Sequence, residues 1–199
     1  MVLNETAIVF IGFQNDYFSP EGILRSVIEE SATHSRTLSN TLRLIEALKD
    51  TAVTLLQTPI QLGEEPPTAD AETGILGTIH RTGAFRRGQP GSRIIDAFEP
   101  FQSRIETIPG KARLNAFSNT RLANTLNQRR IKNVCLAGAV TSICIDSTAR
   151  AAASQGYNVS VFADCTASRS TFEQSFYCDN IFPLYATVQN SNTFIQQAA

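Results

Sequence analysis

Short apolar runs alternate with longer amphipathic segments along the whole chain. The runs predict strands at residues 7–11, 52–56, 134–137 and 159–162, and two further strands at 104–108 and 184–188. Runs that are short and almost continuously apolar are typical of strands covered on both faces. The alternation of strands with helical segments predicts a three-layer α/β/α sandwich with a mostly parallel sheet.

The helical segments carry their own signals. Leu38, Leu42, Ile45 and Leu48 share one face of a predicted helix, and the stretch from Ser170 to Glu173 reads as a capping box. A further helix over 142–155 is expected to stop at Gly156. The segment 59–92 is rich in Gly, Pro, Thr and charge, and it is predicted to be a long loop that is either functional or disordered.

Composition narrows the possible functions. A chain of 199 residues with 42% hydrophobic content predicts a single domain spanning 1–199. The net charge of -1 gives no reason to bind nucleic acid or a membrane surface. The N-terminus lacks a basic leader and no apolar run reaches bilayer length, so a cytoplasmic protein is expected. The four cysteines form no C-x-x-C pair and are expected to be reduced thiols.

Cys144 is the first candidate for chemistry. The predicted strand ends at Ala137, Gly138 permits a tight turn, and the following helix places the thiol near its first turn, where open α/β sheets bind ligands. The helix N-terminus favours a thiolate, and its N–H groups can receive an oxyanion. The alternative is a small buried hydrophobic residue.

Lys111 is the second candidate, because it follows a predicted strand and projects toward the same rim. An ammonium group near a thiol stabilises the thiolate. The alternative is an ordinary solvated surface lysine.

Three segments together resemble the isochorismatase-like cysteine hydrolases: AIVFIGFQNDYF, KARLNAF and GAVTSICIDSTARAAASQGYNVSVFADCTAS. The similarity runs from about Ala7 to Val188. It implies a flavodoxin-like fold and a Cys-Lys-Asp set that acts on small amides or ureido compounds through a thioester-type intermediate, without a cofactor. It also implies a small-molecule substrate and a homo-oligomer, either a dimer or a tetramer.

The resemblance assigns roles by motif position. Cys144 corresponds to the nucleophile and Lys111 to the basic residue, and the N–H groups of Thr141 and Cys144 correspond to the oxyanion hole. The Val140–Thr141 peptide is expected to be cis. Substrate contacts are expected from Phe18, Phe117 and Val140, with Phe85 as a further aromatic, although core or subunit-interface packing explains these aromatic rings equally well.

The first motif departs from the family, because Gly12 stands where the family carries its catalytic Asp. That carboxylate accepts the thiol proton and returns it to the leaving group, a role worth roughly two to four orders of magnitude in rate. On this reading Lys111 holds a thiolate but supplies no proton shuttle. Asp16 belongs to the structural part of the motif, and Glu64 or Glu65 from the loop has no specific support as a substitute. A natural loss and an engineered substitution are both open.

Two function hypotheses follow. The first is a cysteine hydrolase of a small amide or ureido substrate with reduced activity, and the second is an inactive family member that binds a small ligand or a protein partner. True isochorismatase chemistry is disfavoured, because the chain keeps the Cys and lacks the Asp. A metal is not expected, because residues 58–64 lack the Asp and two His of the family's nicotinamidases and the chain has only two histidines.

Overall fold

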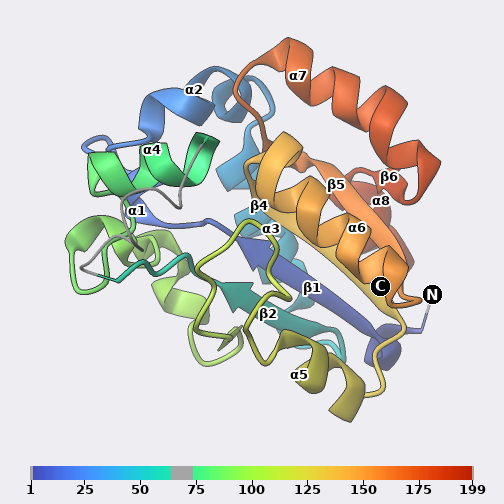
Figure 1. Cartoon of the computed structure of the whole chain (residues 1–199). Helices are drawn as coiled ribbons and strands as arrows, with labels where there is room; N and C mark the ends of the chain where they lie inside the picture. Colours follow the sequence, from blue (N-terminus) through green and yellow to red (C-terminus); the bar gives the residue numbers. More distant parts are fainter. Residues whose placement is uncertain (1, 64–73, 199) are drawn as a thin grey trace.

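The computed structural model describes residues 2–63 and 74–198. Six parallel strands form one sheet in the order β3-β2-β1-β4-β5-β6, with helices on both faces (Figure 1). This confirms the predicted three-layer α/β fold. The strands are β1 (Thr6–Ile11), β2 (Thr54–Thr58), β3 (Glu106–Thr107), β4 (Asn133–Ala139), β5 (Asn158–Ala167) and β6 (Thr187–Gln189).

Eight α-helices connect and flank these strands within the described residues. They are α1 (Asn15–Phe18), α2 (Arg25–His34), α3 (Thr37–Leu48), α4 (Gly74–Thr82), α5 (Leu122–Gln128), α6 (Asp146–Ser154), α7 (Thr171–Phe176) and α8 (Ser191–Ala198). No helix among the described residues is long and apolar enough to cross a membrane.

Side chains of β1 alternate between two cores. Ala7, Val9 and Ile11 belong to the core under α5 and α6, whereas Ile8 and Phe10 belong to the core under α3 and α8. All of them are buried, which is the pattern of a strand covered on both faces. Figure 1 shows α6 and α3 on opposite sides of the sheet.

One predicted feature is wrong and another is only half present. Residues 74–82 form α4, although the whole of 59–92 was expected to be loop, because Ile75, Leu76 and Ile79 give this short segment an apolar face that packs on the core. The Ser170 side chain accepts from the Glu173 N–H at 3.1 Å, as a capping box requires. The Glu173 carboxylate, however, accepts from Ser168 Oγ and from the backbone N–H and guanidinium of Arg169.

Strands β1, β2 and β4 end at the same edge of the sheet. Ile11 lies beside Thr58 on one side and Gly138 on the other. A Cβ at Gly138 would overlap the Ile11 carbonyl, so only glycine permits this close approach of β1 and β4. The segments that follow these strands therefore meet in one place, and Figure 1 shows α1 and α4 beyond the end of β1.

Candidate active site

Cys144 lies on a π-helical turn, Thr141–Ile145, which joins the end of β4 to α6. The Val140 carbonyl accepts from the N–H groups of Ile143 and Ile145, both at 3.1 Å, and so anchors the turn on the strand end. The thiol is nearly inaccessible, with 3% of the residue exposed. The predicted position at the carboxyl edge of the sheet is where the structure places it.

Lys111 reaches the same point from the segment after β3. Its backbone bridges to Ile60, and its carbonyl accepts from the Gln61 N–H at 3.0 Å. The side chain is fully buried. Nζ lies 3.6 Å from Cys144 Sγ and donates to the Arg113 carbonyl at 2.7 Å. The structure thus brings together the two residues that the sequence selected, and it rules out a solvated lysine.

Gln14 fixes the backbone that carries this lysine. Its buried side-chain amide accepts from the Ile60 N–H at 2.7 Å and donates to the carbonyls of Ile60 and Ser92, both at 2.8 Å. A primary amide that makes three such bonds locks its neighbours in register. Gln14 is therefore a positioning residue for Lys111, acting through Ile60.

Gly12 follows β1 with a φ of +74°, a conformation that L side chains rarely adopt. A Cβ there would lie 2.8 Å from the Ala139 carbonyl oxygen and 3.4 Å from the ring of Tyr17. The backbone at the expected position of the catalytic Asp is thus shaped for glycine.

Among the described residues, no carboxylate forms an ion pair with Lys111.

Tyr17 is a buried neighbour of this site that the sequence analysis did not select. Burial raises the pKa of its phenol well above the usual value, and the nearby charges of Cys144 and Asp16 raise it further. The phenol is therefore a neutral group beside the thiol. The available signal was its place in the first motif, directly after Asp16.

Phe85 packs its ring on Tyr17, with the ring centroids 5.0 Å apart. The residue is fully buried and has a φ of +55°, which is costly for a bulky side chain. Strain of this kind costs about 1–3 kcal/mol and persists where surrounding contacts impose it. Here the Phe85 N–H donates to Asp16 Oδ2 at 2.5 Å, and its carbonyl accepts from the Leu62 N–H at 3.0 Å.

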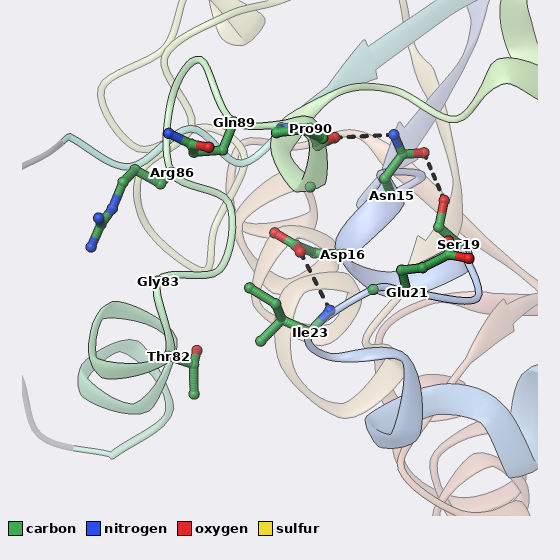
Figure 2. A pocket seen from close by; sticks show the side chains of 12 residues that line it. Asn15, Asp16, Ser19, Glu21, Ile23, Thr82, Gly83, Arg86, Gln89 and Pro90 are labelled. Atoms are coloured by element: carbon green, nitrogen blue, oxygen red, sulfur yellow. Dashed lines mark hydrogen bonds between the residues drawn. The ribbon is translucent and has the colours of Figure 1, made fainter.

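Asp16 serves the surrounding loops. Besides Phe85, its carboxylate accepts from the Ile23 N–H at 3.4 Å, and a Cβ at Gly91 would overlap it. This carboxylate lines a cavity of about 570 Å³. Figure 2 shows it between α1 and the loop that carries Arg86. Neither Cys144 nor Lys111 lines this cavity. The contacts agree with the structural role expected for Asp16.

A second glutamine holds the nucleophile turn. Thr141 Oγ1 donates to Gln174 Oε1 at 2.6 Å, while Gln174 Nε2 donates to the Ala163 carbonyl at 3.0 Å and to Thr166 Oγ1 at 2.9 Å. Gln174 on α7 thereby ties the turn to β5, and no local sequence signal marks it.

The cis peptide is Ala139–Val140, one residue before the predicted Val140–Thr141 bond, so that prediction is wrong.

The expected substrate contacts lie in different places. Val140 is buried next to the nucleophile turn. Phe18 stacks on Phe13 with centroids 5.0 Å apart, and Phe117 stacks on Tyr157 at 6.2 Å, beside the start of β5 rather than its carboxyl end. Both rings pack against the core cluster that contains Val140.

The other three thiols belong to the packing. Cys135, Cys165 and Cys178 are buried, and desolvation raises the pKa of each to about 12. Within 2–63 and 74–198, no group of three His, Cys, Asp or Glu residues is placed to hold a metal ion. Glu64 and Glu65, considered above as substitute carboxylates, lie outside the described residues.

Comparison with solved structures shows the same fold. A cysteine hydrolase from Pseudomonas syringae pv. phaseolicola 1448A superposes with a TM-score of 0.81 at 19% identity, covering 100% of this chain and 94% of that one. N-carbamoylsarcosine amidase from Thermoplasma acidophilum gives a TM-score of 0.73 at 20% identity, covering 94% and 97%.

Sequence comparison gives the family. YddQ of Bacillus subtilis (strain 168), an uncharacterized isochorismatase family protein, is 25% identical over 96% of this chain and 99% of its own length. Ureidoacrylate amidohydrolase RutB of Methylobacterium radiotolerans is 27% identical over 81% of this chain, which spans 66% of that relative. The Isochorismatase domain model matches residues 6–193. The chain therefore belongs to the isochorismatase domain family.

Proposed function

We propose that this protein is a cysteine hydrolase that cleaves a C–N bond in a small amide or ureido-type substrate, with Cys144 as the nucleophile. The observation that carries the proposal is the 3.6 Å distance between Lys111 Nζ and Cys144 Sγ in a site that excludes solvent. An ammonium at this distance stabilises a thiolate, and the attraction is stronger where water is absent.

The reaction has two halves. The Cys144 thiolate attacks the substrate carbonyl carbon, and the backbone N–H groups of Thr141 and Cys144 receive the oxyanion. Loss of the amine leaves a thioester on Cys144, which water then cleaves. The anchored turn and the bond between Thr141 and Gln174 support this assignment, because an oxyanion hole acts through donors whose positions are fixed in advance.

Two observations support the substrate class. Relatives by sequence or fold include a ureidoacrylate amidohydrolase and an N-carbamoylsarcosine amidase, both named as amide hydrolases. The near-complete burial of Cys144 and Lys111 favours a small substrate, because a large one would require a wide opening at the thiol.

The test combines turnover with trapping of the intermediate. The purified protein is incubated with a panel of carbamoyl, ureido and simple primary amides, ammonia release is measured, and the intact mass is recorded at short times. We expect ammonia release with at least one compound and an acyl adduct on the Cys144 peptide. Cys144→Ala is the control and should show neither. Equal release by this variant, or none from the whole panel, rejects the proposal.

An inactive binding protein is the second candidate, and Gly12 favours it. A Cβ at Gly12 would lie 2.8 Å from the Ala139 carbonyl oxygen, so a side chain where the family's proton carrier is expected requires the local backbone to shift. In that case a compound from the panel raises the melting temperature equally in the wild type and in Cys144→Ala, without ammonia release.

We also propose that the protein is a homo-oligomer. Phe172 and Phe176 on α7 are both exposed and stack with ring centroids 6.2 Å apart. Exposed aromatic pairs of this kind are common at protein interfaces. Light scattering of the wild type and of Phe172→Ser tests the assembly, and a monomeric wild type rejects it.

A further inference from the structure

Lys111 is a buried lysine whose polar partners, among the described residues, carry no permanent negative charge. Its side chain is fully removed from solvent, and its two polar contacts with described residues are a backbone carbonyl and a thiol, neither of which is a permanent anion. A buried ammonium needs a counter-ion to offset lost hydration, and without one the group tends to give up its proton.

Over the part of the chain that the structure describes, this site lacks a counter-ion, and the one expected from the family resemblance is a carboxylate at position 12. Asp16 does not replace it, because its oxygens accept from the N–H groups of Phe85 and Ile23. Tyr17 is a further titratable group beside the thiol, and burial keeps its phenol neutral. Within the described residues, the partner that can take a charge opposite to that of Lys111 is Cys144 itself.

The direction in which the pKa of Lys111 is shifted also supports a neutral amine. Burial lowers the pKa of Lys111, and attraction to the Cys144 thiolate opposes that change. A neutral amine is thus accessible when the thiol is protonated, and an ammonium is favoured once the thiol has lost its proton. Lysines with this behaviour serve as catalytic bases, in contrast to arginine, which stays protonated.

We propose that Lys111 carries the protons of the hydrolysis itself, as general base and general acid in a Cys144–Lys111 dyad that replaces the Cys-Lys-Asp set. The inference rests on the proposed hydrolase function. Lys111 then transfers protons in addition to stabilising the thiolate.

The proton balance closes over one cycle. The thiol proton moves to the neutral Nζ, Sγ bonds to the carbonyl carbon, and the ammonium returns that proton to the leaving nitrogen as the C–N bond breaks. In the second half Nζ takes a proton from water, the water oxygen bonds to the carbonyl carbon, and the C–S bond breaks. The departing thiolate recovers the proton from Nζ. Amide and water have become acid and amine, and the dyad is restored.

The decisive experiment is Lys111→Arg, because a guanidinium keeps the positive charge and cannot act as a base. Two rates are measured at neutral pH: amide turnover, and alkylation of Cys144 by iodoacetamide followed on its peptide by mass spectrometry. The dyad predicts that alkylation stays within about tenfold of the wild type while turnover falls by about 10²–10⁴. Turnover within about threefold of the wild type overturns the dyad.

A measurement without arginine guards against misfolding of that variant. The chain has three lysines, Lys49, Lys111 and Lys132, so carbon-13 labelling of the lysine ε-carbon gives three resonances to titrate. We use Cys144→Ala, in which no thiolate opposes deprotonation. Lys111 should titrate at a lower pH than the two exposed lysines. A midpoint equal to or above theirs overturns the dyad.

These outcomes separate the two proposals. A wild type that hydrolyses no amide rejects the hydrolase and the dyad with it. A wild type that hydrolyses an amide while Lys111→Arg remains as active, or while Lys111 titrates with the other lysines, rejects the dyad alone.

Discussion

Asp16 and Lys111 are both buried, and their surroundings differ in a way that separates structural from reactive charge. The Asp16 carboxylate accepts from two backbone N–H groups and ties α1 to the loop after α4. Within residues 2–63 and 74–198, the polar partners of the Lys111 ammonium are one backbone carbonyl and one thiol. A charge met by fixed donors stabilises the fold, whereas a charge left short of partners exchanges its proton readily.

The contrast predicts opposite responses to removing each charge. The largest effect is expected for Lys111→Met, in which a flexible apolar side chain of similar size fills the same space. Amide turnover should fall by about 10²–10⁴. The free energy of unfolding should stay the same or rise by about 1–4 kcal/mol, because the cost of desolvating the ammonium disappears.

The pH dependence of this gain has a definite sign. The pKa of Lys111 is lower in the folded protein, so the unfolded chain binds the proton more readily and the lysine opposes folding at neutral pH. The stability advantage of Lys111→Met is therefore present at neutral pH and shrinks as the pH rises toward about 10.4. Urea unfolding of both proteins across this range checks it, and a loss of stability at neutral pH contradicts it.

A smaller effect is expected from placing a carboxylate at position 12. Gly12→Asp puts it where the motif resemblance expects a catalytic Asp, but strains a left-handed backbone by about 1–3 kcal/mol. Gly12→Asn is the matched control, because it imposes the same shape without a proton-accepting oxygen.

The Lys111→Arg background makes the comparison sharpest. There the fixed cation can stabilise a thiolate, and the new carboxylate can carry the proton. Gly12→Asp should raise amide turnover about tenfold or more over Gly12→Asn in that background. Equal rates in the two double variants would show that a carboxylate at this position does not reach the reacting atoms.

Much of this arrangement was predictable, because it follows from local signals. Apolar periodicity placed the strands and α3, and the order of the strand ends brought Cys144 and Lys111 to one edge. Motif resemblance added their roles and marked Gly12 as the departure. These inferences depend on residue type and on neighbours in sequence.

The remainder depends on a backbone acceptor and on contacts between distant segments, and neither leaves a signature in the residue types. The carbonyl of Arg113 accepts from Lys111, and a backbone acceptor cannot be recognised from side-chain type. Gln174 reaches Thr141 from 33 positions away. The left-handed Phe85 is imposed by Asp16 from 69 positions away, against the preference of an aromatic residue.

The smallest change in turnover is expected for Asp16→Asn, which breaks the comparison if it fails. In the wild type each carboxylate oxygen accepts from one backbone N–H, whereas an Asn side chain has a single accepting oxygen. One N–H therefore loses its partner, and the free energy of unfolding should fall by about 1–3 kcal/mol. Turnover should fall less than about tenfold where the variant is still folded, because this side chain transfers no proton.

Glu21→Gln is the control: it removes an exposed carboxylate from the same cavity and should change stability by less than about 0.5 kcal/mol. Urea unfolding and amide turnover are measured on both variants. If Asp16→Asn keeps its stability and loses turnover by more than about 10², then Asp16 is the proton carrier and Lys111 is only a fixed cation.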